Sequence, residues 1–337
     1  MKKSLLTLLA ITCIALLHSC VDATQKPAQS IPDPKPPVKI PSFNKDSAYV
    51  FIEKQLSFGT RVPGSEGHQA CKEWMVQKFK SYGADVIEQD FMANIYTGDS
   101  WPATNIIAQF NPEHKDRIIL SAHWDTRFIG EEDPDKNMKD KPIPGADDGG
   151  SGTGVLIEIA RILKDNPIDL GVDIILWDAE DQGSRDGDGS AASSKLWCLG
   201  SQHWSLNKHK KNYRAKWGIN LDMIGAKKPT FYKDEASYTY AGVLLDKVWS
   251  LAQNMGYSDM FRDKKIGGLV DDHLFINQMA KIPMIDIINY KVEEGKGSFM
   301  EKWHTHDDDI TNIDKRSLRV VGQVVTAVIY KESDGTL

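Results

Sequence analysis

Carboxylate and histidine side chains recur along the chain at points where buried strands are predicted to end. They occur as His123-Trp124-Asp125, Asp147-Asp148, Glu180-Asp181, Asp222, Asp271-Asp272-His273 and His304. In α/β proteins the functional site lies at the carboxyl ends of the strands. Zinc binds imidazole nitrogen and carboxylate oxygen, and a carboxylate that is not a ligand can transfer protons. The pattern therefore predicts a zinc centre with an acid–base group beside it.

The adjacent acids Glu180 and Asp181 are the strongest physical indication of a metal. They follow an apolar run at 172–177 that reads as a buried strand. Two carboxylates at a buried strand end repel each other and lose hydration unless a cation is present. One of them can bind the metal while the other acts as a general acid or base. The alternative, a solvated acidic loop, is disfavoured by the apolar run that precedes the pair.

The earlier members of the series also have structural interpretations. Because side chains alternate along an extended chain, Asp125 lies on the same side as His123 and could orient its ring. Both could equally belong to a solvated strand end. Asp147 and Asp148 precede a predicted helix, which one of them could cap, and this leaves the other available. Asp222 by itself could be a cap or a turn residue.

The later members lie in two polar segments. Asp271 and its neighbours open a helical stretch, where acidic residues favour the helix N-terminus. His304 lies in the acidic loop Trp303-His-Thr-His-Asp-Asp-Asp309, which also contains His306. Since one residue separates the two histidines, one can face the site while the other faces water. His306 is therefore an alternative ligand.

The elements that must position these residues alternate along the chain from residue 46. Helices are predicted at 46–57, 66–82, 151–164, 236–255 and 313–332, and strands at 85–89, 105–110, 117–122, 172–177, 217–221 and 284–288. Continuous apolar strands separated by amphipathic helices indicate a mostly parallel sheet covered on both faces. We expect one α/β domain over residues 45–337, with long loops at 128–144 and 182–195.

Composition narrows the possible functions further. The net charge is −6 and there is no dense block of Lys and Arg, so a nucleic-acid partner has little electrostatic support. Cys71 and Cys198 are the cysteines outside the N-terminal segment, and we expect two free buried thiols rather than a disulfide. The chain has no Cys-x-x-Cys motif, which argues against a thiolate zinc site.

The N-terminus has the pattern of an export signal. Lys2 and Lys3 precede an apolar run at 5–17 that is too short to span a membrane. The run ends at Leu17-His-Ser-Cys20, which resembles a bacterial lipobox, and simple cleavage is the alternative. We predict a signal peptide over 1–20, a lipid anchor on Cys20 and a Pro-rich tether over 21–44. The protein would then be periplasmic or anchored to the outer membrane.

In their order along the chain, the motifs resemble the zinc aminopeptidase superfamily. Within it, the chain resembles the glutaminyl cyclases of animal type and their bacterial relatives. The resemblance runs from about residue 45 to 332 and rests on Gly59-Thr-Arg-Val-Pro-Gly-Ser-Glu-Gly67, His123-Trp-Asp125, Gly145-Ala-Asp-Asp148, Asp178-Ala-Glu-Asp181, Leu221-Asp-Met-Ile-Gly-Ala226, Asp271-Asp-His273 and Trp303-His-Thr305. It implies a three-layer αβα sandwich around a mixed, mostly parallel sheet.

The resemblance also implies a role for each site residue. The zinc ligands would be Asp148, Asp181 and His304, although animal cyclases have Glu where this chain has Asp181. Glu180 would shuttle protons, supported by a carboxylate network of Asp222 and Asp271. A small pocket would be walled by Trp303, Phe299 and Trp197.

The implied reaction is zinc-dependent cyclisation of N-terminal glutamine to pyroglutamate with release of ammonia. The expected partners are peptides or proteins with an N-terminal Gln, and we expect a monomer with one zinc ion. The alternative is an aminopeptidase with two zinc ions, whose second site would use His123 and Asp222. A third possibility is a surface lipoprotein that binds without catalysis.

Overall fold

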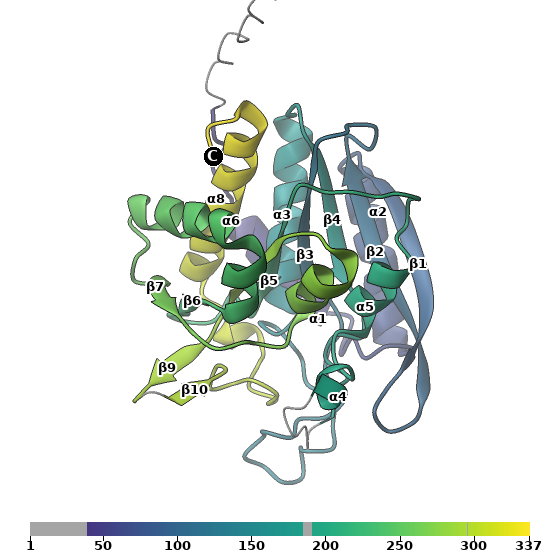
Figure 1. Ribbon diagram of the computed structural model, residues 1–337. Coiled ribbons are helices and arrows are strands. Elements are labelled where there is room, and N and C mark those ends of the chain that lie inside the picture. The colour runs from purple at the N-terminus through teal and green to yellow at the C-terminus, as the bar shows by residue number, and fades with distance from the viewer. Residues whose placement is uncertain (1–38, 185–190, 295) are drawn as a thin grey trace, which may run out of the picture. The chain divides into compact units, whose positions relative to one another are not determined.

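A six-stranded mixed sheet forms the centre of the protein in the computed structural model, which describes residues 39–184, 191–294 and 296–337 (Figure 1). The strand order is β1-β2-β4-β3-β5-β8. Neighbours from β4 to β8 are parallel, whereas β1, β2 and β4 pair antiparallel. The strands are β1 (Asp85–Asn94), β2 (Ser100–Phe110), β3 (Arg117–His123), β4 (Gly171–Trp177), β5 (Gly218–Asp222) and β8 (Met284–Ile288).

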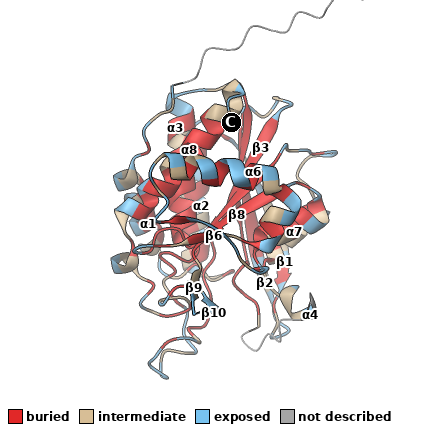
Figure 2. Ribbon diagram, turned by 60° about the vertical axis from the view of Figure 1, so that its left-hand side comes forward, coloured by how far each residue is buried: buried red, intermediate tan, exposed pale blue. Residues whose placement is uncertain are grey.

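Helices cover both faces of this sheet, because its central strands are apolar on both sides. Ile118 and Leu120 of β3 join one core cluster, and Ile119 between them joins the other. The first cluster packs against α1 (Lys45–Leu56), α2 (Glu66–Ser81), α3 (Gly150–Asp165), α6 (Glu235–Asn254) and α8 (Lys315–Asp334). The second packs against α5 (Leu199–Leu206) and the π-helix Ile276–Ala280 that follows α7 (Asp272–Phe275). The predicted three-layer architecture is thereby confirmed, and Figure 2 shows its buried strands between partly exposed helices.

Helix α3 lies unusually close to the sheet and brings the segment before it to the strand ends. A Cβ on Gly152 would lie 2.5 Å from the carbonyl oxygen of Leu221 and 2.8 Å from the Cβ of Ala122. Only a glycine therefore permits this approach between α3 and strands β3 and β5. The helix is capped by Gly149, at φ 80°, without a side-chain hydrogen bond. The cap interpretation of Asp147 and Asp148 is thus wrong.

The predicted elements agree with the structure where they are apolar and differ where they are polar. The hairpin strands β1 and β2 are longer than expected, since their outer ends are exposed and carry no continuous apolar run. Short elements were not predicted at all: α4 (Ala191–Ser194), α5, β6 (Phe231–Lys233), β7 (Phe261–Lys265), β9 (Lys291–Glu293) and β10 (Lys296–Ser298).

Several predicted segments lie wholly or partly outside the residues that the structure describes. The predicted signal peptide and residues 21–38 of the tether lie outside the described residues, as does 185–190 of the predicted second loop. At the end of the tether, Phe43 is buried and Asn44 caps α1, so these residues pack with the domain.

Among the described helices, none is both long enough and apolar enough to cross a membrane. Cys71 and Cys198 are buried and unpaired.

Candidate active site

Three parallel strand ends place the predicted residues at one edge of the sheet. His123 is the last residue of β3 and pairs with Trp177 at the end of β4. Asp222 is the last residue of β5. Glu180 and Asp181 lie three and four residues after Trp177, the last residue of β4. Since parallel strands point in one direction, residues far apart in the sequence meet beyond their carboxyl ends.

One candidate metal group consists of Asp148, Asp181 and His304. One ligand atom from each lies within 4.8 Å of the others, and all three side chains are buried. His304 Nε2 lies 3.0 Å from Asp181 Oδ1 and 3.8 Å from Asp148 Oδ2. Oδ2 of Asp148 and Oδ2 of Asp181 are buried without a hydrogen-bond partner. Burial and the charge of Asp148 raise the pKa of Asp181 to about 6. Two unsatisfied carboxylate oxygens beside an imidazole fit a zinc ion.

His123, Asp148 and Asp222 form a second group with the same spacing limit. His123 Nε2 lies 3.0 Å from Asp148 Oδ1 and 3.1 Å from Asp222 Oδ1. Its Nδ1 lies 3.5 Å from Asp125 Oδ1 but has no hydrogen-bond partner, so Asp125 lies beside the ring without the hydrogen bond that an orienting role would need. His123 can thus act either as a ligand of a second ion or as a hydrogen-bond donor to the two carboxylates.

Glu180 lies beside these candidate metal groups, but its surroundings differ from those of its neighbour Asp181. Burial raises the pKa of Glu180 well above its usual range; His123 opposes this, while Asp181 and Asp271 raise it further. The thiol of Cys198 donates a hydrogen bond to Glu180 Oε1 at 3.2 Å. A carboxylate that binds a proton this readily suits general acid–base chemistry near neutral pH.

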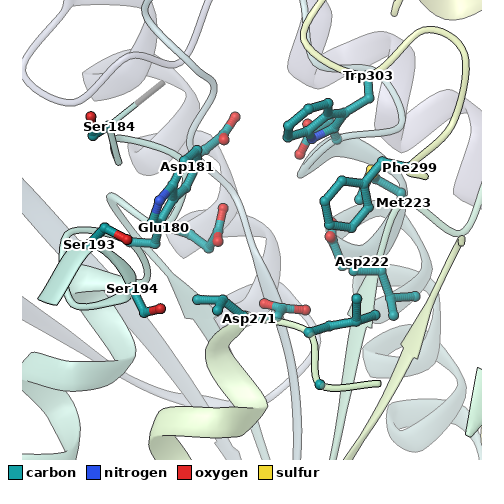
Figure 3. A pocket seen from close by; sticks show the side chains of 16 residues that line it. Glu180, Asp181, Ser184, Ser193, Ser194, Asp222, Met223, Asp271, Phe299 and Trp303 are labelled. Atoms are coloured by element: carbon teal, nitrogen blue, oxygen red, sulfur yellow. The ribbon is translucent and has the colours of Figure 1, made fainter. Parts of the chain in front are cut away.

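Asp222 and Asp271 lie beside Glu180 in the wall of a single cavity (Figure 3). Burial raises the pKa of Asp222 to about 7; His123 opposes this, and Asp271 adds to it. Asp271 accepts a hydrogen bond from Asn220 Nδ2 at 3.0 Å. The structure therefore brings the three predicted proton-handling carboxylates together, although Glu180 takes its side-chain hydrogen bond from Cys198 rather than from either Asp.

Three aromatic side chains also line this cavity, whose volume is about 350 Å³, together with serine and aliphatic residues. Phe299 and Trp303 pack together with ring centroids 4.8 Å apart. Trp303 also stacks on His304 at 3.7 Å, and Trp197 lies parallel to His304 at 6.1 Å. All three aromatic residues that the sequence suggested thus line the cavity, and Trp303 stacks on the candidate ligand His304.

Two buried aspartates hold the backbone that carries these ligands. Asp125 accepts hydrogen bonds from the main-chain N–H groups of Glu180 at 3.1 Å and Asp181 at 3.2 Å. Asp308 accepts them from Asp147 and Asp148, each at 3.0 Å. Asp308 was not singled out from the sequence, because three consecutive aspartates in an acidic loop look alike.

His306, the alternative ligand, is directed elsewhere. Its Nδ1 lies 2.9 Å from Asp133 Oδ2, and its main-chain N–H donates to the same oxygen. Among the described residues, His306 belongs to none of the groups that could hold a metal. The structure therefore places His304 with Asp148 and Asp181.

Comparisons with known proteins show which family the chain belongs to. The chain is 43% identical to Bacteroides thetaiotaomicron glutaminyl cyclase over 87% of this chain and 99% of that one, with a TM-score of 0.83. It is 24% identical to bovine glutaminyl-peptide cyclotransferase over 80% of this chain and 78% of that protein. It is also 28% identical to aminopeptidase YwaD of Bacillus subtilis, of which it spans only 42%. Residues 105–329 match the model of peptidase family M28, and the chain belongs to that family.

Proposed function

We propose that this protein is a zinc-dependent glutaminyl cyclase that converts the N-terminal glutamine of peptides to pyroglutamate and releases ammonia. The observation that carries the proposal is the position of Glu180. Its carboxylate lies beside the Asp148–Asp181–His304 group, in the wall of an aromatic cavity of about 350 Å³. The similarity to glutaminyl cyclases along nearly their whole length supports the same conclusion.

In this reaction the α-amine nitrogen attacks the γ-carboxamide carbon, a C–N bond forms, and the amide nitrogen leaves as ammonia. Glu180 would accept a proton from the amine and deliver it to the leaving nitrogen. Its burial near Asp181 and Asp271 increases its affinity for that proton during the transfer. A zinc ion held by the three-residue group would polarise the carboxamide oxygen as a Lewis acid.

The aromatic walls would supply proximity. The substrate side chain is flexible, and it must fold back for its carboxamide to meet its own amine. Phe299, Trp303 and Trp197 line part of the cavity and would limit the conformations available to the substrate within it. Holding the two reacting groups together raises the rate by lowering the entropy cost of the encounter.

We propose one zinc ion per chain. Burial raises the pKa of Asp222, and the nearby charge of Asp271 raises it further, whereas His123 opposes the change. A carboxyl group that retains its proton is a weaker ligand for a second ion. The alternative is an aminopeptidase with two zinc ions, and the second group of His123, Asp148 and Asp222 is the observation that favours it. Metal analysis of the purified protein distinguishes one ion from two.

One assay tests the reaction itself. The domain is incubated with a peptide that begins with Gln, and the peptide mass is followed. Loss of ammonia from an otherwise intact peptide is the expected result. Loss of the whole first residue would identify an aminopeptidase, and an unchanged mass would indicate a binding protein.

The cellular location is a further part of the proposal. Export through residues 1–20 with a lipid anchor on Cys20 would place a monomeric enzyme in the periplasm or at the outer membrane. Fractionation of cells that express the full chain and its Cys20→Ala variant tests this. The unchanged chain should be found with membranes, and the variant should lose that association.

A further inference from the structure

The irregular segment 127–133 contacts both histidines of the loop that carries the candidate ligand His304. Glu131 Oε1 lies 2.9 Å from His304 Nδ1, and Asp133 Oδ2 lies 2.9 Å from His306 Nδ1. The side chain of Glu131 is only 9% exposed. Two carboxylates of one segment thus hold two histidines of another in the same way, but only one of these histidines faces the metal group.

Arg127 connects this segment to the rest of the site. Its side chain is fully buried; Nε donates to Glu131 Oε1 at 2.6 Å, and Nη1 donates to the main-chain oxygen of Asp181 at 2.7 Å. Its guanidinium carbon also lies 4.6 Å from the ring centroid of Trp197. Arg127 therefore contacts the main chain of the candidate ligand Asp181. It also contacts Glu131, which lies beside the candidate ligand His304, and Trp197 in the cavity wall.

We propose that Glu131 and Arg127 are positioning residues, with Glu131 orienting His304 for zinc and Arg127 coupling the metal group to the cavity wall at Trp197. This inference rests on the proposed zinc site. Neither residue belongs to the series of acids and histidines at the predicted strand ends.

The physical reason lies in the two nitrogens of the imidazole ring. When Nδ1–H donates to Glu131, the remaining lone pair is on Nε2, which points toward Asp181 and Asp148. A histidine that binds a metal commonly donates its other N–H to a carboxylate, which sets the tautomer and strengthens the ligand. The positive charge of Arg127 compensates the negative charge of the buried Glu131 carboxylate. The cation–π contact of Arg127 with Trp197 restrains the position of the Trp197 ring.

The test measures zinc affinity directly, by competition with a chromophoric zinc chelator and without substrate. Glu131→Ala should weaken zinc binding by about 10- to 100-fold, since loss of such a partner typically costs that much. Glu131→Gln, which keeps the shape and one acceptor, should recover part of this loss. The matched control is Asp133→Asn, which alters the same kind of contact to His306 and should change zinc affinity by less than about two-fold.

Thermal unfolding of each metal-free variant checks folding independently of zinc. If Glu131→Ala does not fold, Glu131→Gln alone decides the question. Zinc affinity unchanged in Glu131→Gln and Glu131→Ala, or weakened equally in Asp133→Asn, would overturn the proposal. Because no substrate is used, these outcomes do not depend on whether the enzyme cyclises or hydrolyses peptides.

Arg127 has its own expected result. Arg127→Lys keeps the charge but loses the planar group that bonds and stacks at once, so it should both weaken zinc binding and raise KM. Glu131→Gln, assayed at saturating zinc, should leave KM near that of the unchanged protein. An Arg127→Lys variant with KM and zinc affinity both unchanged would show that Arg127 does not couple the two.

Discussion

Glu180 and Asp181 are neighbouring residues of similar chemistry whose surroundings suit different tasks. Asp181 faces His304 at 3.0 Å and its main-chain oxygen is held by Arg127, an arrangement suited to a ligand. Glu180 faces the thiol of Cys198 and two further carboxyl groups, which raise its pKa with burial. Their surroundings, rather than their identities, separate the proposed ligand from the proposed proton carrier.

Glu180→Gln should lower kcat by about 10²- to 10⁴-fold, the range expected when a general acid–base group is removed. Zinc content should stay the same, because the proposed ligands are untouched. The measurements are ammonia release under saturating substrate and metal analysis of the same sample. Glu132→Gln, at an exposed position nearby, is the control. Normal turnover in Glu180→Gln would refute the assigned role.

Cys198 gives a second prediction at the residue scale. Its Sγ donates to Glu180 Oε1 at 3.2 Å, and a hydrogen bond to a reacting carboxylate is worth about 1 kcal/mol or more. Cys198→Ala should therefore change kcat/KM by about five-fold. Cys198→Ser, which restores a donor, should lie closer to the unchanged protein. Equal activity in both variants and the unchanged protein would mean that this contact does not influence catalysis.

At the scale of elements, α3 and the strands it covers act as the frame of the site. The helix approaches β5 so closely at Gly152 that no side chain fits, and β5 ends at Asp222. Asp148 precedes the same helix and is held there by Asp308. A small shift of α3 would therefore move the candidate ligand Asp148 relative to Asp222, the carboxylate proposed to support proton transfer.

Gly152→Ala should lower the free energy of unfolding by about 1–3 kcal/mol, because the new methyl group would overlap the carbonyl oxygen of Leu221. Gly242→Ala in α6 is the matched control, since a Cβ there would have no neighbour within 4 Å. It should be neutral or stabilise by up to about 1 kcal/mol through helix propensity. Chemical denaturation of both variants measures the difference, and a harmless Gly152→Ala would contradict the close packing.

At the scale of the whole molecule, the buried acidic groups make stability depend on pH. Burial is the first cause that raises the pKa of Asp222 and Asp308 to about 7 and of Asp181 to about 6. Although burial opposes it, Asp181 raises the pKa of His304 to about 9. All four groups bind protons more tightly in the folded protein than in the unfolded chain, so their contribution favours folding at low pH and is lost as pH rises.

The metal-free protein should accordingly have a lower Tm at pH 8.5 than at pH 6. Zinc binds the deprotonated ligands, so the increase in Tm on adding zinc should be larger at pH 8.5. Glu131, whose pKa is about 2 because hydrogen bonds from His304 and Arg127 outweigh burial, does not titrate in this range. Thermal unfolding at both pH values, with and without zinc, provides the measurement. A Tm of the metal-free protein that rises between pH 6 and 8.5 would contradict this account.

The sequence by itself determined the elements with strong local signals. The apolar runs of β3, β4 and β8 and the helices α1, α2, α3, α6 and α8 were predicted within about two residues. The outer parts of β1 and β2 and the short polar strands were not, because their stability comes from partners distant in the sequence. The order of acids and histidines also indicated the family to which the chain belongs.

Only the tertiary structure decided which of these residues meet. It selected His304 over His306, put Asp308 behind Asp148, and brought Glu131 and Arg127 against the candidate ligands. The physical reason is distance through space. Local sequence patterns determine which side chains stand at a strand end, whereas the pairing of parallel strands and the packing of α3 determine which strand ends become neighbours.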